Sequence, residues 1–214
     1  MSSYRVGVDI GGTFTDVTLL NEDTGDVRAV KVPTTPKDPA IGALLGLRRA
    51  LEEEGIKADL LSSLIHATTV VTNTVIERKG AKVGLIATKG FGDILEIGRE
   101  RRVTQYDIFE DRLPSLVPRH LRKSVDERVA YNGKILKELD RDQAKAVIED
   151  LAKLGVDSIA VSLLHSYSNP KHERIIKEII EDEFPHILVS LSSSILPEWR
   201  EYERTSTTVV NAYA

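Results

Sequence analysis

The sequence predicts an α/β fold, in which strands and helices alternate along the chain. The first 32 residues alternate apolar and polar side chains and predict three consecutive strands. Two later runs, residues 82–88 and 158–164, are short and apolar throughout, which is typical of buried strands in a parallel sheet. Helical periodicity between such runs indicates strand–helix–strand units with right-handed crossovers. A chain of 214 residues can form one large or two small domains.

The three N-terminal strands begin with a hairpin. Residues 6–10 and 17–20 are its two predicted strands. The sequence EDTGD at residues 22–26 predicts a turn, which leads to a third strand at residues 27–32.

A helix follows these strands. Asp38 is its predicted N-cap, Pro39 takes the first helical position, and Gly55 ends it. The apolar spacing predicts that the helix faces the core through Ile41, Leu44, Leu45 and Leu51.

Strands and helices continue to alternate up to residue 100. Residues 63–69 predict a strand, and residues 70–79 predict a short helix that stops at Gly80. The buried strand at 82–88 comes next, and residues 90–100 predict another helix.

Residues 99–123 have no regular periodicity and predict an irregular segment. Pro114 and Pro118 interrupt it, and its basic residues are Arg99, Arg101, Arg102, Arg112, Arg119, Arg122 and Lys123. An irregular connection of this length in a compact domain is either functional or a partner surface. The simplest interpretation of its charge is a solvated surface. The alternatives are contact with an acidic substrate or with a companion subunit.

Regular structure returns after this segment. Residues 125–139 predict a hairpin around the Asn132–Gly133 turn. Asp140 and Gln143 resemble a capping box that starts a helix. The predicted core face of this helix comprises Ala144, Val147, Ile148, Leu151 and Leu154.

The last third of the chain predicts two more helices. Asn169 and Pro170 start the first, so helix initiation explains this stretch better than a histidine metal site. Residues 187–192 predict a strand. From residue 197 the apolar residues recur at helical spacing, and this stripe needs a surface to cover it. We expect one N-terminal domain at residues 1–196, and the start of a following domain or a linking helix at 197–214.

Composition excludes several classes of function. A net charge of −4 argues against a nucleic-acid or anionic-membrane partner. The absence of cysteine excludes disulfides, thiolate metal sites and cysteine nucleophiles. The sequence has neither an apolar run of membrane-spanning length nor an N-terminal signal peptide, so a cytoplasmic protein is expected.

The first hairpin carries small and polar residues where an apolar run would otherwise continue: Asp9, Gly11, Gly12, Thr13, Thr15 and Asp16. Successive amides at a glycine pair form an anion-binding nest, and the threonines add hydroxyl donors. Asp9 repels phosphate unless a hydrated Mg²⁺ lies between them, and Asp16 can hold a second water or orient Thr13. The alternative is a plain glycine-rich turn, but an aspartate inside a strand favours a phosphate site.

A second candidate is the stretch HATTVVTN, with His66, Thr68, Thr69, Thr72 and Asn73. It lies at a strand end and the first turn of a helix, where free amides attract anions. The alternative is helix capping by Thr69, with His66 a core residue. As a functional residue, His66 is a substrate ligand or a proton carrier.

Four blocks of the sequence resemble one known family. The stretch VDIGGTFTD resembles the first phosphate motif of the ATPase superfamily that includes actin, hexokinase and heat-shock chaperones. Together with residues 65–100, 116–129 and 196–213, it resembles the hydantoinase/oxoprolinase family, and the resemblance covers residues 4–213. It implies a ribonuclease H-like, actin-like ATPase N-terminal domain, with a mixed sheet and flanking helices.

The resemblance also implies an activity. Family members use ATP to phosphorylate the carbonyl oxygen of a cyclic amide of the hydantoin or 5-oxoproline type, and water then opens the ring. It implies that Asp9 is the Mg²⁺-side carboxylate, that Gly11, Gly12 and Thr13 form the phosphate turn, and that Thr15 and Asp16 support it. His66 and Asp16 are the candidate catalytic residues. The candidate substrate-binding residues are Thr68, Thr69 and Asn73.

The sequence departs from the family pattern in one respect. Family members carry a second Asp-Xaa-Gly-Gly-Thr motif in a following domain, and this sequence has only one. The expected partners are therefore the remaining domain of the same protein or a companion hydantoinase subunit, in an oligomeric full enzyme. The alternatives are half of a sugar- or acyl-kinase-like phosphotransferase, and a non-catalytic assembly subunit that retains the fold.

Overall fold

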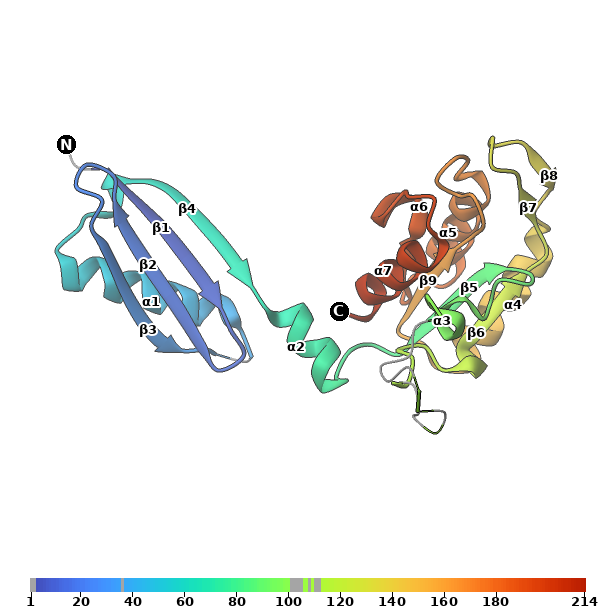
Figure 1. Cartoon of the computed structure of the whole chain (residues 1–214), viewed down its shortest axis with the longest axis horizontal. Coiled ribbons are helices and arrows are strands. Elements are labelled where there is room, and N and C mark those ends of the chain that lie inside the picture. The colour runs from blue at the N-terminus through green and yellow to red at the C-terminus, as the bar shows by residue number, and fades with distance from the viewer. Residues whose placement is uncertain (1–2, 36, 101–105, 108, 110–112) are drawn as a thin grey trace. The chain divides into compact units, whose positions relative to one another are not determined.

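The chain folds into two compact units, Met1–Glu77 and Arg78–Ala214, each built around its own four-stranded sheet (Figure 1). The computed structural model describes residues 3–35, 37–100, 106, 107, 109 and 113–214. The division falls inside the predicted domain of residues 1–196. The boundary predicted at residue 196 is not tested by this division and stays a prediction.

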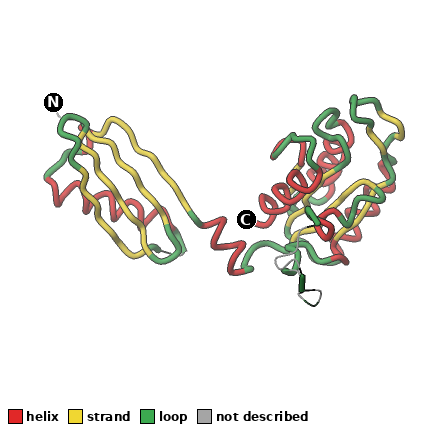
Figure 2. The backbone as a smooth tube through the Cα atoms, in the orientation of Figure 1, coloured by secondary structure: helices red, strands yellow, loops and turns green. Residues whose placement is uncertain are grey.

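The first unit has a mixed sheet in the order β3-β2-β1-β4. The strands are β1 (Tyr4–Ile10), β2 (Phe14–Asn21), β3 (Val27–Pro33) and β4 (Leu61–Thr68). The first three form an antiparallel meander, and β4 pairs in parallel with β1. The helices are α1 (Pro39–Glu54), the 3₁₀ turn η1 (Ala58–Leu60) and α2 (Val70–Glu77). Figure 2 draws the strands of this sheet in yellow, and β3 is the strand that precedes α1 in the chain.

Helix α1 begins and ends where the sequence predicts but faces the sheet with other residues. Asp38 accepts a hydrogen bond from the Ala40 amide, and Gly55 closes the helix in the left-handed region. The buried residues of α1 are Gly42, Gly46 and Ala50. The predicted core residues Ile41, Leu44 and Leu45 are instead 49%, 56% and 54% exposed.

Close packing explains this error. A Cβ atom on Gly46 would lie only 2.9 Å from Cγ2 of Val17 on the sheet. The small residues therefore let α1 approach β2 and β3 closely, and Ile41, Leu44 and Leu45 lie outside this contact. The fourth predicted residue, Leu51, is partly buried and packs against the core, so the predicted face is only partly the face that packs.

The second unit has a parallel sheet in the order β10-β9-β5-β6. Its strands are β5 (Val83–Thr88), β6 (Arg122–Val125), β9 (Ser158–Ser162) and β10 (Leu188–Leu191). A separate hairpin joins β7 (Arg128–Val129) to β8 (Ile135–Lys137). The helices are α3 (Ile94–Ile97), η2 (Arg119–Leu121), α4 (Arg141–Lys153), α5 (Lys171–Glu183), α6 (Ser192–Ile195) and α7 (Glu201–Tyr213). No helix in the described part of the chain is long and apolar enough to cross a membrane.

Two predictions between residues 90 and 125 are wrong in part. The predicted helix at 90–100 is reduced to α3, because Gly98 ends it at a positive φ of 57°. Strand β6 begins at Arg122, inside the segment predicted to be irregular. Of the basic residues there, Arg101, Arg102 and Arg112 lie outside the described residues.

The apolar face of α7, the last helix, packs against other elements of the second unit. On α7, Val209, Ala212 and Tyr213 are buried, and the helix packs on β9 and β10. Ser158 on β9 donates to the Ala212 carbonyl at 2.6 Å. The stripe that begins near Trp199 is thus largely covered by this chain itself, although Trp199 is 69% exposed.

Candidate functional site

The turn between β1 and β2 is built so that only glycine fits its first position. The Gly11 amide donates to the Phe14 carbonyl at 2.9 Å and closes the turn. A Cβ atom on Gly11 would lie 2.8 Å from that same carbonyl oxygen. Because the clash would be with backbone, a side chain at this position would distort the turn.

Two threonines stabilise the turn through hydrogen bonds. Thr15 is fully buried, and its hydroxyl lies 2.9 Å from that of Thr34, just after β3. The Thr34 hydroxyl donates to the Gly11 carbonyl at 2.9 Å, and the Thr34 amide donates to the Thr13 carbonyl at 3.0 Å. The sequence analysis did not predict a role for Thr34, because only the pairing of β2 with β3 brings Thr34 next to the turn at residues 11–13. Thr15 lies where a supporting residue would.

Beside the turn, charged residues form a row across the sheet. Asp9 on β1 lies opposite Asp16 on β2, and Asp16 lies opposite Lys31 on β3. Lys31 forms an ion pair with Asp16 at 3.1 Å. Within the described residues, no hydrogen bond or ion pair engages the Asp9 carboxylate, and its other neighbour is Ala67 on β4.

This row fits a hydrated cation. Like charges directly opposite each other on neighbouring strands repel, and Lys31 neutralises only Asp16. Mg²⁺ keeps most of its waters and needs only one or two carboxylates. The Asp9 and Asp16 side chains provide that donor set, next to a turn with two glycines.

The second predicted motif lies against the same turn. The Thr69 amide donates to the Ile10 carbonyl at 3.2 Å, at the end of β1. The Asn73 amide group donates to the Thr69 hydroxyl at 3.4 Å. A Cβ atom on Gly12 would lie 3.0 Å from Asn73 Nδ2, so the two motifs meet at this glycine. Thr69 directly precedes α2 and its carbonyl accepts from the Asn73 amide at 2.9 Å, whereas the side-chain hydrogen bond at this end comes from Thr68, whose hydroxyl accepts from the Val70 amide at 3.2 Å.

His66 lies on the other face of the sheet. It pairs in register with Val8, so its side chain points to the side of Val8 and Ile10, whereas Asp9 points to the opposite side. There it lines a largely apolar cavity of about 530 Å³, together with Leu44 and other residues of α1. The structure therefore does not bring His66 together with Asp9 and Asp16, and its catalytic role stays a prediction.

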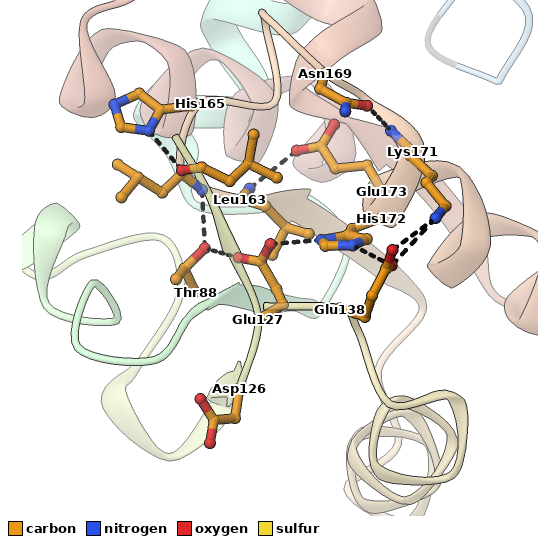
Figure 3. A network of polar contacts seen from close by, with 12 residues as sticks. Thr88, Asp126, Glu127, Glu138, Leu163, His165, Asn169, Lys171, His172 and Glu173 are labelled. Atoms are coloured by element: carbon orange, nitrogen blue, oxygen red, sulfur yellow. Dashed lines mark hydrogen bonds and ion pairs between the residues drawn. The ribbon is translucent and has the colours of Figure 1, made fainter. Parts of the chain in front are cut away.

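A second polar cluster lies in the second unit, around the buried Glu127 (Figure 3). The Thr88 hydroxyl donates to Glu127 Oε1. Glu127 Oε2 lies 2.7 Å from His172 Nδ1, and Glu138 Oε2 lies 3.2 Å from His172 Nε2. Burial by itself lowers the pKa of His172, but the hydrogen bonds to the two carboxylates outweigh it and raise that pKa.

This cluster is satisfied internally. Glu173 accepts from the Leu163 amide at 2.9 Å, from the Ser192 hydroxyl at 2.7 Å and from the Ser193 amide at 2.9 Å. Buried polar groups with every partner present rigidify a fold and leave little capacity for a ligand. Among the described residues, no three histidine, aspartate or glutamate side chains gather as a metal site. The prediction of helix initiation at Asn169 is confirmed, since the Asn169 side chain accepts a hydrogen bond from the Lys171 amide. No signal in the sequence predicted the carboxylate partners of His172.

Comparison with known proteins identifies the family. The model of the hydantoinase/oxoprolinase N-terminal region matches residues 5–184. The chain belongs to this family.

Relatives share this region across most of the chain. An uncharacterized protein of Methanocaldococcus jannaschii is 44% identical over 98% of the chain and 31% of its own length. The alpha subunit of caprolactamase from Pseudomonas jessenii is 37% identical, with the same shares of each chain. The 5-oxoprolinase of Saccharomyces cerevisiae is 32% identical over 99% of the chain and 19% of its own length. The chain thus spans about a third or less of these relatives.

Two solved structures share the fold. Nucleotide-free acetone carboxylase matches with a TM-score of 0.89 and 32% identity, over 100% of this chain and 32% of that one. The ATP-dependent caprolactamase of P. jessenii matches with a TM-score of 0.82 and 36% identity, over 98% and 31%. These matches, with the mixed sheet and its helices, confirm the predicted α/β, ribonuclease H-like, actin-like class.

Proposed function

We propose that this chain is the N-terminal, nucleotide-binding part of an ATP-dependent hydrolase that opens a cyclic amide of the hydantoin or 5-oxoproline type. The observation that carries the proposal is the Asp9 carboxylate, which has no hydrogen-bond or ion-pair partner among the described residues and lies beside a turn whose geometry leaves no room for a side chain at position 11. Caprolactamase, described as ATP-dependent, and 5-oxoprolinase support the substrate class.

The residues of the turn bind the phosphates of ATP. The backbone amides around Gly12 and Thr13 donate to phosphate oxygens, and the absence of a side chain on Gly12 lets the phosphates approach. Asp9, with Asp16 beside it, would hold Mg²⁺, which neutralises phosphate charge. Thr15 and Thr34 keep the turn in place from below.

The amide substrate would lie near the start of α2, against Thr69 and Asn73. Thr68, the third predicted substrate residue, pairs with Ile10 and lines the cavity on the His66 side of the sheet. Transfer of the γ-phosphoryl group of ATP to the amide carbonyl oxygen, with release of ADP, would make the carbonyl carbon more electrophilic. Water would then add to that carbon, and the ring C–N bond would break with a proton going to the nitrogen. The acyl phosphate so formed would be hydrolysed by a second water to the carboxylate and inorganic phosphate. The protein contributes position and charge stabilisation to such a transfer. Asn73 is well placed for this, because it contacts both Thr69 and the turn at Gly12.

Nucleotide binding by the 214-residue chain tests the proposal. We expect MgATP to shift the amide resonances of Gly11, Gly12 and Thr13 in ¹H–¹⁵N NMR spectra. Asp9→Asn should weaken binding about tenfold or more, because it removes the carboxylate that faces the cation. Asp59→Asn is the matched control, since Asp59 is an exposed acid of the same unit.

Two outcomes would contradict the proposal. One is the absence of shifts at the turn at millimolar MgATP. The other is equal binding by the wild type and Asp9→Asn. Because the sequence has a single phosphate motif, we also expect this chain alone not to hydrolyse ATP, with or without cyclic amides. Robust Mg²⁺-dependent turnover that is lost in Asp9→Asn would refute that requirement for a second motif.

A further inference from the structure

A polar cavity in the second unit lies over one face of the edge strand β6. Its volume is about 300 Å³, and its lining comprises Gly90, Gly92, Asp93, Arg119, Arg122 and Ser124. The glycines and Asp93 belong to the loop that follows β5, while Arg122 and Ser124 alternate along β6 and share one face of the sheet.

Arg122 is the main feature of this cavity. Its side chain is only 4% exposed, its Nε donates to the Val117 carbonyl at 2.9 Å, and its Nη2 donates to Glu96 at 3.0 Å. Nη1 is buried and has no hydrogen-bond acceptor among the described residues. Oδ1 of Asp93 forms a long ion pair with Nη1 at 4.0 Å, beyond hydrogen-bond distance. Leaving a buried guanidinium nitrogen without a hydrogen-bond acceptor raises the free energy of the folded protein. This indicates that a bound ligand supplies the missing acceptor.

Two further donors face the same space. Arg119 is 78% exposed and pairs with Asp93 at 2.8 Å. An exposed ion pair of this kind contributes little, so an entering anion can replace Asp93 as the partner of Arg119. Ser124 adds a hydroxyl, and because position 92 is glycine, the space in front of that hydroxyl stays open: a Cβ atom there would lie 3.4 Å from Ser124 Oγ.

We propose that this cavity binds the carboxylate or phosphate group of a small molecule, with Arg122 Nη1 and Arg119 as its cationic ligands. The planar donor fork of arginine matches the oxygen spacing of both groups. Asp93 moves away from Arg119 when the anion binds. The site goes beyond the proposed nucleotide turn, because all of its residues belong to the second unit.

Titration of the 214-residue chain with two probes, inorganic phosphate and acetate, tests this site. We expect saturable shifts of the Gly90 and Gly92 amides and of the Arg122 side-chain NH resonances in ¹H–¹⁵N NMR spectra. The probe that binds more tightly identifies the group that the cavity prefers. Arg119→Gln and Arg122→Gln should each weaken binding about tenfold or more, as expected for a charge-assisted contact.

The control is Lys123→Gln, which makes the same change of charge on the same strand but on its opposite face. It should leave the affinity unchanged. If Arg122→Gln fails to fold, Arg122→Lys is the second variant. It keeps the positive charge but lacks the paired N–H donors of the guanidinium, so it should still weaken binding. Absence of saturable shifts with both probes overturns the proposal, and so does equal binding by the wild type and Arg119→Gln. Neither result bears on MgATP binding at Gly11 and Gly12, so the two proposals fail separately.

Discussion

The two units differ in how most of their polar side chains are satisfied; Arg122, whose buried Nη1 has no hydrogen-bond acceptor among the described residues, is the exception in the second unit. In the first unit, Asp9 stands on an exposed sheet face without a partner among the described residues. In the second unit, Glu127, Glu173 and Arg204 are at most 2% exposed and are held by several partners. Polar groups that are buried must be bonded internally, whereas groups that serve a ligand must stay available to it. The difference therefore separates residues that stabilise the fold from residues that can do chemistry.

The largest effect is expected for Asp9→Asn in the complete enzyme. ATP-dependent turnover of a cyclic amide should fall by about 100-fold or more, because a charge that stabilises the transfer is lost. The free energy of unfolding of the 214-residue chain should change by less than about 0.5 kcal/mol, since the Asp9 carboxylate makes no hydrogen bond or ion pair with the residues that the structure describes. Steady-state kinetics and urea unfolding measure the two quantities. A stability loss as large as the catalytic one would mean that Asp9 is structural.

The reverse pattern is expected for Arg204→Ala in the second unit. The Arg204 guanidinium donates to the Glu198 carbonyl at 2.7 Å, the Leu163 carbonyl at 3.0 Å and the Glu201 carboxylate at 2.6 Å. Removing a buried, paired charge should lower the free energy of unfolding by about 3 kcal/mol or more. Arg49→Ala, which removes an exposed pair with Glu53, should cost about 0.3–0.5 kcal/mol. Urea unfolding compares the two, and equal losses would contradict the role assigned to burial.

A smaller loss is expected for Gly11→Ala at the turn. The added Cβ would lie 2.8 Å from the Phe14 carbonyl oxygen, so the turn must shift, at a cost of about 1–3 kcal/mol. Gly7→Ala on β1, the strand that leads into the turn, is the control, because no described atom beyond its chain neighbours lies within 4 Å of a Cβ there. Thermal unfolding of both variants measures the difference. If Gly11→Ala is as stable as Gly7→Ala, the turn is not as constrained as its geometry indicates.

The most gradual effect is a pH dependence at His172. Its pKa is raised above the ordinary value of 6.5, so its contribution to stability is complete below about pH 6.5 and is lost as pH rises through the raised pKa. The stability difference between wild type and His172→Gln should therefore shrink from about pH 6 to pH 9. Glu127, Glu138 and Lys171 are the charged groups nearby, and Glu138 also binds Lys171 at 3.0 Å. Urea unfolding across this range checks the trend, and a difference that grows with pH would reverse the sign.

Local sequence signals predicted the elements whose causes are local. Asp140 accepts from the Asp142 and Gln143 amides at the start of α4, as its position before an apolar run indicated. The hairpin at Asn132 and Gly133 also forms, with a positive φ of 81° at the glycine. Such features depend on the backbone preferences of one or two residues, so they can be read from the sequence.

The sequence by itself determined the α/β class, the family and the glycine turn beside Asp9, because these depend on local residue order and on motifs. Only the tertiary structure decided which face of α1 packs, that His66 and Asp9 point to opposite sides of the sheet, and that Asn73 meets Gly12. It also placed Arg122 in a cavity and enclosed His172 between two carboxylates. These relations depend on strand register and on close packing between residues far apart in the chain. A change of register by one residue would move every side chain of a strand to the opposite face of the sheet.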